Sequence, residues 1–560
     1  MAKPEPTPEQ AASLLTEMGE LMSLAGENPF KVRAFEKAAA TVGGVKDLAA
    51  RARAGTLTEI AGIGKGIAEV LTDYFVKDVT PQLDAVKSKI SPALLELVRV
   101  RGLGPKKAQL LIDELGIQTI SELEYACREN RLLKLKGFGE KLQQKVLEQI
   151  QFLNSTRGQF RLDVARAGAA EVEPALKKAL DKLGIKAEAK SGAEAFSATG
   201  AYRRELEVVE ALEYLVRLPE KGAAAVREKL EKLAAELGGH EKQPVPVKLA
   251  FAEADRYGYE LARTTATEAH WKKLGAPKSF AAASETDFYK KIELPWIGPE
   301  MRESGEEVEL AKKGKLEAIL AWDGVQGVFH NHSTYSDGVN TIAEMVEGAR
   351  KLGFKYIGIS DHSQSAFYAQ GLKTDALKKQ RKEIDAVREK YDDIEIFWGV
   401  ESDILADGGL DYDEKTLAAF DFVVASIHSR FQMDRKAMTE RVLKAVRHPA
   451  TRFLGHLTGR LLLGRAGFDL DMEAVIAECA KRDVAIEINA NPARLDIDWR
   501  FGPQLRAHET LVSVNPDAHE VAGLADTRYG VAVARKALLP ASLVVNARSA
   551  KDVGRWLKRA

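Results

Sequence analysis

A short stretch of this sequence combines two histidines, an aspartate and a glycine at a spacing that suits metal binding. His330 and His332 are separated by one residue, so in an extended strand their imidazoles project to the same side. Asp337 follows within one short loop, and Gly338 permits a tight turn directly after it. Because imidazole and carboxylate together suit zinc, manganese or iron, the stretch predicts part of a divalent metal site.

Other residues of ligand type follow apolar runs throughout the C-terminal part of the chain. From Gly324 onward, seven strand-like runs alternate with helix-like runs, which is the pattern of a parallel α/β barrel. The carboxyl ends of such strands meet on one face of the barrel, where active sites lie. The residues of ligand type at these ends are His330, His332, Asp361, His362, Glu401, Asp403, His428, His456, Asn489, Asn491, Asp517 and His519.

Six of the ten histidines lie at these strand ends, a distribution that chance would rarely produce. The other four, His240, His270, His448 and His508, do not follow strand-like runs, and we expect them on the surface or in turns. The pattern therefore predicts one pocket lined by imidazoles and carboxylates.

These motifs closely resemble the PHP (polymerase and histidinol phosphatase) phosphoesterase domain, over residues 323–560. The family pattern is His-x-His and Asp, then His, Glu, His and His, and finally Asp-x-His. Its positions are filled here by His330, His332, Asp337, His362, Glu401, His428, His456, Asp517 and His519. The resemblance implies a distorted (β/α)7 barrel, a cluster of three divalent ions held by these residues, and phosphoester hydrolysis. Manganese and zinc suit the mixed ligand set, and clustered cations lower the pKa of water enough that no protein nucleophile is required.

Three further residues of this region each have two possible roles. Arg460 could clamp a phosphate oxygen bidentately, or it could form a structural salt bridge. Asp361 and Asp403 could orient the imidazoles of metal ligands, or they could cap helices.

The N-terminal part of the chain repeats one pattern three times, an apolar residue, any residue, Gly, an apolar residue and Gly, followed by Lys. Each copy lies between two helix-like runs, and the glycines and lysines concerned are Gly62, Gly64, Lys65, Gly102, Gly104, Lys106, Gly137, Gly139 and Lys141. Glycine lets the backbone approach a phosphate, the following helix points its N-terminal amides at the anion, and lysine adds charge without reading a base. The spacing resembles the helix-hairpin-helix module, which implies DNA-backbone binding without sequence specificity. Glycine-containing turns between packed helices are the alternative.

The middle of the chain resembles the palm of family X DNA polymerases. Residues 198–216 contain Gly200, Arg203 and Arg204, followed by a strand-like run, as in the family motif of Gly-Ser-x-Arg-Arg and then Asp-x-Asp on a strand. An Asn-Pro-Phe-Lys helix start at Asn28 and the Leu-Pro-Trp-Ile-Gly-Pro-Glu segment from Leu294 extend the resemblance over roughly the first 320 residues. A PHP domain behind such a core is the bacterial domain order, so the two resemblances support each other.

The catalytic carboxylates of that palm are absent from their expected positions. Alignment on Gly200 places Ala211 and Glu213 at the two aspartates of Asp-x-Asp, and Lys248 at the third carboxylate on a neighbouring strand. Two-metal phosphoryl transfer needs these carboxylates to hold both ions, and a lysine repels them. We therefore expect weak or absent polymerase activity.

Other charged residues of the palm have open roles. Glu207, Glu210 and Glu213 could supply replacement metal ligands, or they could be solvated charges. Arg203 and Arg204 could contact phosphate, or they could be surface residues.

Composition limits the class of protein. The 560 residues exceed one hydrophobic core, and 45% hydrophobic with 29% charged residues is typical of globular proteins. Lys+Arg and Asp+Glu are both 82, so any DNA contact must be local. The two cysteines and the lack of a signal-peptide or membrane-spanning apolar run predict a cytoplasmic protein with no membrane partner. The DNA binding implied by the hairpin resemblance would make it nucleoid-associated.

The predicted fold is multidomain, α and α/β. The predicted domains are a helix-hairpin-helix domain (1–85), a fingers-like helix-hairpin-helix domain (86–155), a degenerate palm and thumb (156–300), a linker (301–322) and the PHP barrel (323–560).

The favoured functional hypothesis is a DNA-repair protein. Its PHP domain would act as a metal-dependent 3′-5′ exonuclease or 3′-end-processing phosphoesterase on gapped or 3′-ended duplex DNA. The alternatives are an active gap-filling polymerase with PHP editing and a non-catalytic DNA-binding scaffold. Protein partners are not predicted.

Overall fold

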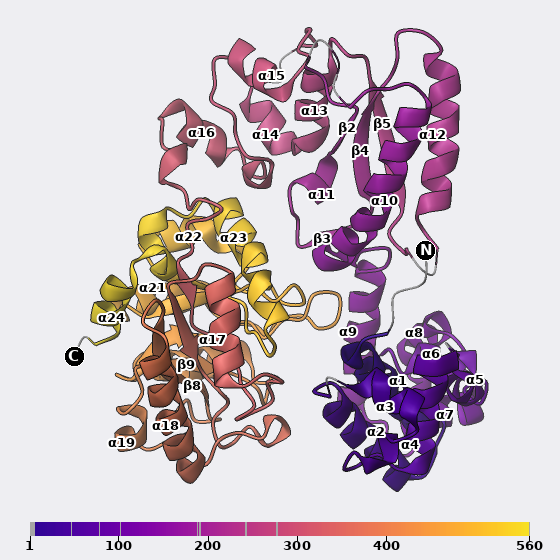
Figure 1. Ribbon diagram of the computed structural model, residues 1–560, viewed down its shortest axis with the longest axis vertical. Coiled ribbons are helices and arrows are strands. Elements are labelled where there is room, and N and C mark those ends of the chain that lie inside the picture. The colour runs from indigo at the N-terminus through magenta and orange to yellow at the C-terminus, as the bar shows by residue number, and fades with distance from the viewer. Residues whose placement is uncertain are drawn as a thin grey trace. The chain divides into compact units, whose positions relative to one another are not determined.

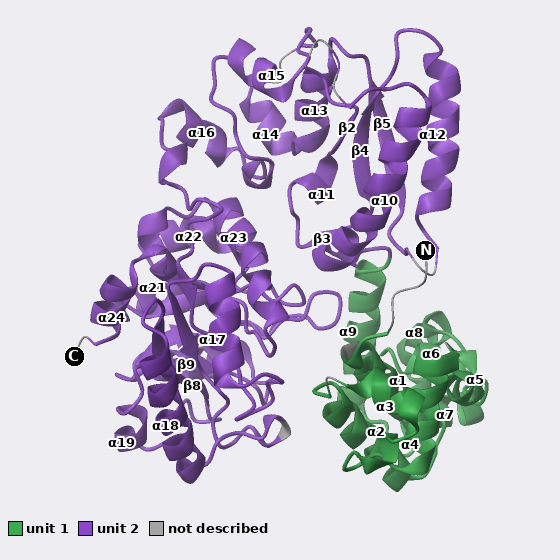
Figure 2. Ribbon diagram, in the orientation of Figure 1, with its two compact units in different colours: residues 1–157 green, residues 158–560 purple. Residues whose placement is uncertain are grey.

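Figure 1 shows a computed structural model of the chain, which describes residues 6–45, 47–77, 79–100, 102–187, 189, 192–240, 243–275 and 278–558. The chain divides into two units, Met1–Arg157 and Gly158–Ala560, which Figure 2 colours separately. The division into five regions predicted from the sequence is finer than these two units and stays a prediction.

The N-terminal unit is helical wherever its regular structure is described. Helix α1 (Pro8–Leu24) begins with a capping box, and α2 (Pro29–Val42) begins at Asn28, whose side chain accepts a hydrogen bond from the backbone amide of Phe30. The apolar face predicted for the first helix is buried, at Leu14, Leu15, Met18, Leu21 and Met22. These residues belong to one core that continues to Ile150.

Short helices complete this unit and set up the three glycine turns. They are α3 (Leu48–Ala54), a 3-10 turn (Leu57–Glu59), α4 (Lys65–Thr72), a π-helical turn (Asp73–Lys77), α5 (Pro81–Lys87), α6 (Pro92–Leu97), α7 (Pro105–Leu115), α8 (Ile120–Arg128), a 3-10 turn (Arg131–Lys134) and α9 (Glu140–Ser155).

The second unit begins with a small sheet. Strand β4 (Leu212–Arg217) is central, antiparallel to β2 (Phe196–Ala198) and parallel to β5 (Val247–Ala252). A separate pair joins β1 (Phe160–Arg161) to β3 (Val208–Val209). The helices of this region are α10 (Leu162–Lys182), α11 (Gly200–Arg203) and α12 (Ala223–Leu237), and small apolar residues of α10 pack against β4.

Helices follow the small sheet, and one of them corrects a prediction. They are α13 (Tyr257–Thr265), α14 (Glu268–Lys273), α15 (Glu285–Lys291), a 3-10 turn (Pro299–Met301), α16 (Glu306–Lys312) and a 3-10 turn (Leu316–Ala318). His270 on α14 is fully buried, so its expected surface or turn position was wrong. Glu307 makes this burial possible, because its Oε1 lies 2.6 Å from His270 Nδ1.

The C-terminal part of the second unit is the predicted seven-stranded parallel barrel. The strands are β6 (Gly327–Val328), β7 (Tyr356–Ile359), β8 (Glu395–Asp403), β9 (Phe422–Ser426), β10 (Thr451–Leu454), β11 (Ala485–Asn489) and β12 (Val512–Asn515). They lie side by side in chain order. A further parallel bridge joins Asn331, just after β6, to Ala518, just after β12, so the barrel is nearly closed.

Helices connect the barrel strands and cover the sheet (Figure 1). They are α17 (Ile342–Lys351), a 3-10 turn (Phe367–Ala369), α18 (Thr374–Lys390), α19 (Glu414–Leu417), α20 (Arg435–Val446), α21 (Met472–Arg482), a 3-10 turn (Trp499–Phe501), α22 (Gly502–Ala507), a 3-10 turn (Ala522–Asp526), α23 (Thr527–Lys536), 3-10 turns (Ala541–Leu543 and Val545–Ala547) and α24 (Ala550–Leu557). Within the described ranges, none of the helices in either unit is long and apolar enough to cross a membrane.

Candidate metal centre and nucleic-acid interface

All nine side chains predicted as metal ligands lie at the carboxyl ends of the barrel strands. Eight of them follow a strand, whereas Glu401 lies within β8, close to its end. His330, His332, Glu401 and His456 are almost completely buried. The arrangement follows from the parallel sheet, which turns residues far apart in sequence toward one face.

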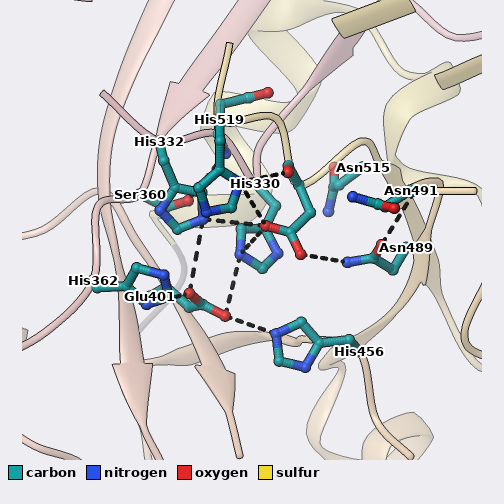
Figure 3. A network of polar contacts seen from close by, with 12 residues as sticks. His330, His332, Ser360, His362, Glu401, His456, Asn489, Asn491, Asn515 and His519 are labelled. Atoms are coloured by element: carbon teal, nitrogen blue, oxygen red, sulfur yellow. Dashed lines mark hydrogen bonds and ion pairs between the residues drawn. The ribbon is translucent and has the colours of Figure 1, made fainter. Parts of the chain in front are cut away.

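Glu401 is the centre of one part of the cluster (Figure 3). Its Oε1 lies 2.9 Å from His456 Nε2 and 3.2 Å from the Nε2 atoms of both His330 and His428. Its Oε2 lies 2.8 Å from His362 Nδ1. One buried carboxylate thus faces four imidazoles.

Two aspartates complete the other part of the cluster. Asp517 Oδ1 lies 3.2 Å from His332 Nε2. Asp337 lies nearer the opening, with Oδ1 3.4 Å from His519 Nε2 and Oδ2 3.6 Å from His362 Nε2. Asp337 and His519 are the more exposed members, at 30% and 39%.

The cluster contains four overlapping groups whose ligand atoms all lie within 4.8 Å of one another. They are His332, Asp337, His362 and His519; His330, His332 and Asp517; His330, Glu401 and His456; and His362, Glu401 and His428. Because the groups share members, the pocket could hold several neighbouring divalent ions rather than one.

Buried polar atoms in the pocket fit a metal ligand set. Both ring nitrogens of His332, Nε2 of His330 and Nδ1 of His456 are buried and make no hydrogen bond in the structure. Leaving such an atom unsatisfied costs about 1–3 kcal/mol. Metal coordination through one nitrogen of each ring would satisfy part of this set, so the residues present fit bound divalent ions.

The pKa values of the pocket reflect burial and opposite charges. Burial lowers the pKa of His428, but Glu401 and Asp403 more than offset this and bring it to about 10. Burial raises the pKa of Glu401, yet the surrounding histidines hold it well below its ordinary value. Burial and the neighbouring imidazoles lower the pKa of His332 to about 3. Ionised carboxylates therefore lie beside a neutral His332, which is the state that metal binding requires, whereas His428 carries a proton that a bound ion would have to displace.

A residue that the sequence analysis missed, Glu487, contacts the ligand histidines and helps to orient them. Glu487, fully buried in β11, places Oε1 2.7 Å from His330 Nδ1. Its Oε2 accepts hydrogen bonds from the His456 backbone amide (2.8 Å) and the Asn489 side chain (3.1 Å). Such a partner fixes which imidazole nitrogen faces the metal. The available signal was a single acid within the apolar run 484–488.

The two aspartates with open roles behave differently. Asp403 Oδ1 lies 2.6 Å from His428 Nδ1, which makes Asp403 an orienter of a predicted ligand. Asp361 caps none of the described helices, and its hydrogen bonds hold a loop. It accepts hydrogen bonds from the backbone and hydroxyl groups of Ser333 and Ser336, and so shapes the loop that follows His332.

Arg460 forms the structural salt bridge that was one of its two predicted roles. Its guanidinium pairs with Asp498 and donates to the carbonyls of Leu495 and Arg494, the latter at 2.8 Å. A phosphate clamp would require these contacts to break. The cation beside the cluster is instead Arg494, whose Nε lies 3.7 Å from Asp517 Oδ2. Sequence reasoning missed it because its place depends on the Arg460 contacts.

The three glycine turns of the N-terminal unit share one geometry. Gly62, Gly102 and Gly137 have φ values of 88°, 97° and 92°, a region that favours glycine. The second glycine of each pair has extended backbone and directly precedes α4, α7 or α9. A Cβ at Gly64, Gly104 or Gly139 would meet no atom within 4 Å. Open space therefore lies in front of three helix N-termini, where a phosphate could approach the amides.

The residues that the alignment placed at the palm carboxylates lie on or just before two neighbouring strands. Glu213 on β4 and Lys248 on β5 are register partners, and buried Ala211 directly precedes β4. Glu213 Oε2 accepts a hydrogen bond from the Ala201 amide at 3.2 Å. A Cβ on Gly200 would lie 1.9 Å from the same oxygen, so the carboxylate fills the turn.

Of the other charged residues with open roles in this region, three are held by partners within the protein and one is exposed. Arg203 bonds both oxygens of Glu285, at 2.8 and 2.9 Å, and Arg204 Nε lies 3.0 Å from Glu303. These arginines are therefore not surface residues, which was one of the two roles predicted for them. Glu207 is buried and accepts hydrogen bonds from Trp499 and Arg500 of the barrel, so it is not the solvated charge of one prediction. Glu210 is exposed, in agreement with a solvated charge.

Three regions of the chain match models of known protein families. Family models match as a PHP domain (residues 329–491), a helix-hairpin-helix domain (7–78) and a SAM-like helix-hairpin-helix tandem (94–151). Probable phosphatases of Caldicellulosiruptor saccharolyticus and Aliivibrio fischeri are 31% and 32% identical, over 27% and 34% of this chain and 59% and 76% of theirs.

A relative of similar length determines the family. The DNA polymerase/3′-5′ exonuclease PolX of Bacillus subtilis (strain 168) is 34% identical over 98% of this chain and 98% of its own. The helix-hairpin-helix matches, together with this relative, support DNA as a binding partner. The likeness extends across almost the whole of both chains, and the chain therefore belongs to the PolX family.

Proposed function

We propose that the barrel removes nucleotides or blocking phosphoesters from DNA 3′ ends in a metal-dependent hydrolysis. One observation carries this proposal most strongly: nine imidazoles and carboxylates converge in a single pocket of a chain that also has three glycine turns open to phosphate. The printed name of the Bacillus subtilis relative, DNA polymerase/3′-5′ exonuclease, supports the same direction of cleavage.

Each part of the pocket has a distinct task under this proposal. His330, His332, Glu401 and Asp517 would hold ions in the buried part, while Asp337 and His519 would hold an ion at the opening, manganese or zinc being the ions that suit them. Bound divalent ions supply positive charge that lowers the pKa of water and neutralises a phosphate. The protein orients the ligands through Glu487 and Asp403, and excludes bulk water by burying the pocket.

The N-terminal unit would hold the DNA by its backbone. Lys65, Lys106 and Lys141 lie in the first turns of α4, α7 and α9, beside the open amides of each helix. Contacts of this kind position the duplex without reading its sequence. A gapped or 3′-ended duplex is the proposed substrate, because binding on both sides of a break would present a 3′ end.

The test uses a gapped duplex in which the strand whose 3′ end borders the gap carries a label at its 5′ end. With manganese, the full-length protein should shorten the strand. The His332→Ala variant should lose this activity. His508→Ala is the matched control, because His508 pairs with Glu473 outside the pocket and its loss should leave shortening unchanged. Shortening by the His332→Ala variant at the wild-type rate would refute the barrel as the active centre.

A second candidate is gap-filling synthesis, which the first half of the relative's printed name favours. We infer that synthesis is weak or absent here, because Ala211, Glu213 and Lys248 stand where the catalytic carboxylates are expected. Supplying dNTPs to the same gapped duplex discriminates the two. Template-directed lengthening would support the polymerase with PHP editing, while metal uptake without hydrolysis of any phosphoester would support the scaffold.

The finer organisation of the chain is part of this proposal. The two helix-hairpin-helix domains would occupy residues 1–85 and 86–155, the degenerate palm and thumb 156–300, the linker 301–322 and the barrel 323–560. A protein that processes DNA ends would be expected in the cytoplasm, in association with the nucleoid.

A further inference from the structure

One phenylalanine, on a loop at the ligand-bearing end of the barrel, is almost completely exposed. Phe367 shows 85% of its surface, more than any other large apolar side chain in the described ranges. It follows His362 by five residues, in the loop between β7 and α18. Because this loop leaves the carboxyl end of a barrel strand, Phe367 lies on the same face as the pocket.

The loop that carries Phe367 is anchored to the pocket. The Ser363 amide donates to the carbonyl of Glu401 (2.9 Å), and the Leu372 amide donates to that of His362 (2.8 Å). Between these points, the Ser365 hydroxyl donates to Asp403 (2.8 Å), the same carboxylate that orients His428. The exposed ring is therefore held by a fixed backbone, which lowers the entropic cost of binding to it.

Arginines and aromatic rings lie on two other loops of this face. After His428, exposed Arg430 precedes Phe431, whose ring stacks on Phe468 with centroids 6.0 Å apart. The guanidinium of Arg465, from the loop after His456, lies over Phe431 at 4.5 Å. A positive charge is thus displayed on an aromatic surface.

Each acidic side chain of the neighbouring β8–α19 loop already has a partner in the protein. Asp407 pairs with Lys444 at 2.9 Å, Asp411 accepts from the Ser365 amide, and Asp413 caps α19. Each of these carboxylates thus has a partner within the protein, and Arg465 in turn donates from Nε to the carbonyl of Gly459 (2.8 Å), which holds its guanidinium over Phe431. Aromatic rings with nearby cations are the features that bind single-stranded nucleic acid, through base stacking and phosphate contact.

We propose that this face of the barrel binds the last nucleotides of an unpaired DNA 3′ end, with a base stacked on Phe367. The inference rests on the proposed function and deepens it, because it explains how a phosphoesterase pocket prefers a DNA strand to a small phosphate ester. The phosphates of the strand would pass the arginine-bearing loops as its end enters the pocket.

Two substrates and two variants test the proposal on the full-length protein with manganese. Phe367→Ala should raise KM for a single-stranded oligonucleotide about tenfold. Hydrolysis of the small ester bis(p-nitrophenyl) phosphate, which carries no nucleobase, should stay within about twofold of wild type, and Phe367→Trp should restore the DNA value. Leu352→Ala is the matched control, since Leu352 is 48% exposed but lies before β7, at the other end of the barrel.

A local fluorescence reading separates this proposal from the proposed function. An oligonucleotide with 2-aminopurine as its 3′-terminal base is bound to the His332→Ala protein, whose fold is retained as judged by thermal unfolding. Stacking should quench the base, and adding Phe367→Ala should remove the quenching. Equal quenching with and without Phe367, or an equal loss of DNA and small-ester hydrolysis in Phe367→Ala, would overturn the inference. If the wild type hydrolysed neither substrate but quenching still depended on Phe367, the proposed hydrolysis would fail while the binding site stood.

Discussion

The Nδ1 atom of His330 lies 2.7 Å from Oε1 of Glu487, and both side chains are fully buried. This contact turns the other ring nitrogen, Nε2, toward Glu401 and Asp517. Glu487→Gln keeps the size of the side chain but removes the charge that favours this arrangement. We expect metal affinity to fall about 10- to 100-fold, measured by competition with a chelator of known affinity.

Two further measurements make this prediction specific. Hydrolysis by Glu487→Gln should recover at high manganese concentration, because the ligands themselves remain. Glu473→Gln removes an exposed carboxylate that pairs with His508, and it should not change metal affinity. The assigned role would be contradicted if Glu487→Gln lost its metal at the same chelator concentration as the wild type.

Arg494 gives a separate prediction about phosphate. Its Nε lies 3.7 Å from Asp517 Oδ2, and Arg460 donates to the backbone carbonyl of Arg494 (2.8 Å), which holds the loop that carries this side chain. Arg494→Ala should weaken inhibition of hydrolysis by inorganic phosphate about tenfold while leaving metal content unchanged. Arg494→Lys should restore part of the binding, because the charge returns without the bidentate geometry.

The control for this prediction is a surface arginine of similar type. Arg482 pairs with Glu478 on the exposed face of α21, and Arg482→Ala should leave phosphate inhibition unchanged. Loss of metal together with phosphate in Arg494→Ala would show that the arginine stabilises the cluster instead.

The paired glycines of the hairpins separate folding from DNA binding. Gly102 has φ 97°, so Gly102→Ala should reduce the free energy of unfolding by about 1–2 kcal/mol. Gly104 has extended backbone and open space around its Cβ position, so Gly104→Ala should leave stability within about 0.5 kcal/mol. Its methyl group would nevertheless stand where a phosphate approaches α7.

Fluorescence anisotropy with labelled duplex DNA at low salt measures this separation. The Gly104→Ala variant should bind more weakly than wild type at unchanged thermal stability, and combining it with Gly64→Ala should weaken binding further. Unchanged affinity in the double variant would mean that these glycines serve only the packing of helices.

The sequence predicted the barrel and its pocket well, because both depend on patterns that are local in the chain. Each strand-like run ends in its own ligand, so His330, Glu401 or Asp517 could be placed without knowing the others. The parallel sheet then brought them together. The hairpins were predictable for the same reason, since a repeated glycine spacing fixes a turn.

Residues whose role depends on a distant partner were the ones predicted poorly. Glu207 was expected to be a metal ligand or solvated, but it is buried by Arg500, almost 300 residues away. His270 was expected to be exposed, but Glu307 permits its burial. Arg460 was open between two roles until the loop carrying Asp498 was placed. A buried charge needs a partner, and sequence spacing does not identify that partner.

Repulsion between carboxylates that lie far apart in the sequence gives a prediction about pH. Asp526, at the start of α23, lies near Asp163 of α10 and Glu520, and burial together with these two charges raises its pKa to about 6. Because the unfolded chain has a pKa near 4, folding is favoured by protonation of this residue. The contribution of Asp526 to the free energy of unfolding is fully present below about pH 4 and is lost as the pH rises through 6. Above that range the ionised group is destabilising, by on the order of 1 kcal/mol once solvent screening is allowed for.

Asp526→Asn removes the charge and should therefore raise the thermal midpoint of the C-terminal unit at pH 8, with a smaller gain at pH 5. Asp552→Asn is a control of opposite sign, because Ser549 and Arg555 lower the pKa of that exposed carboxylate. Unfolding scans of both variants at several pH values measure the effect. A gain for Asp526→Asn that was the same at pH 5 and pH 8 would show that the carboxylate is destabilising for a reason other than its charge.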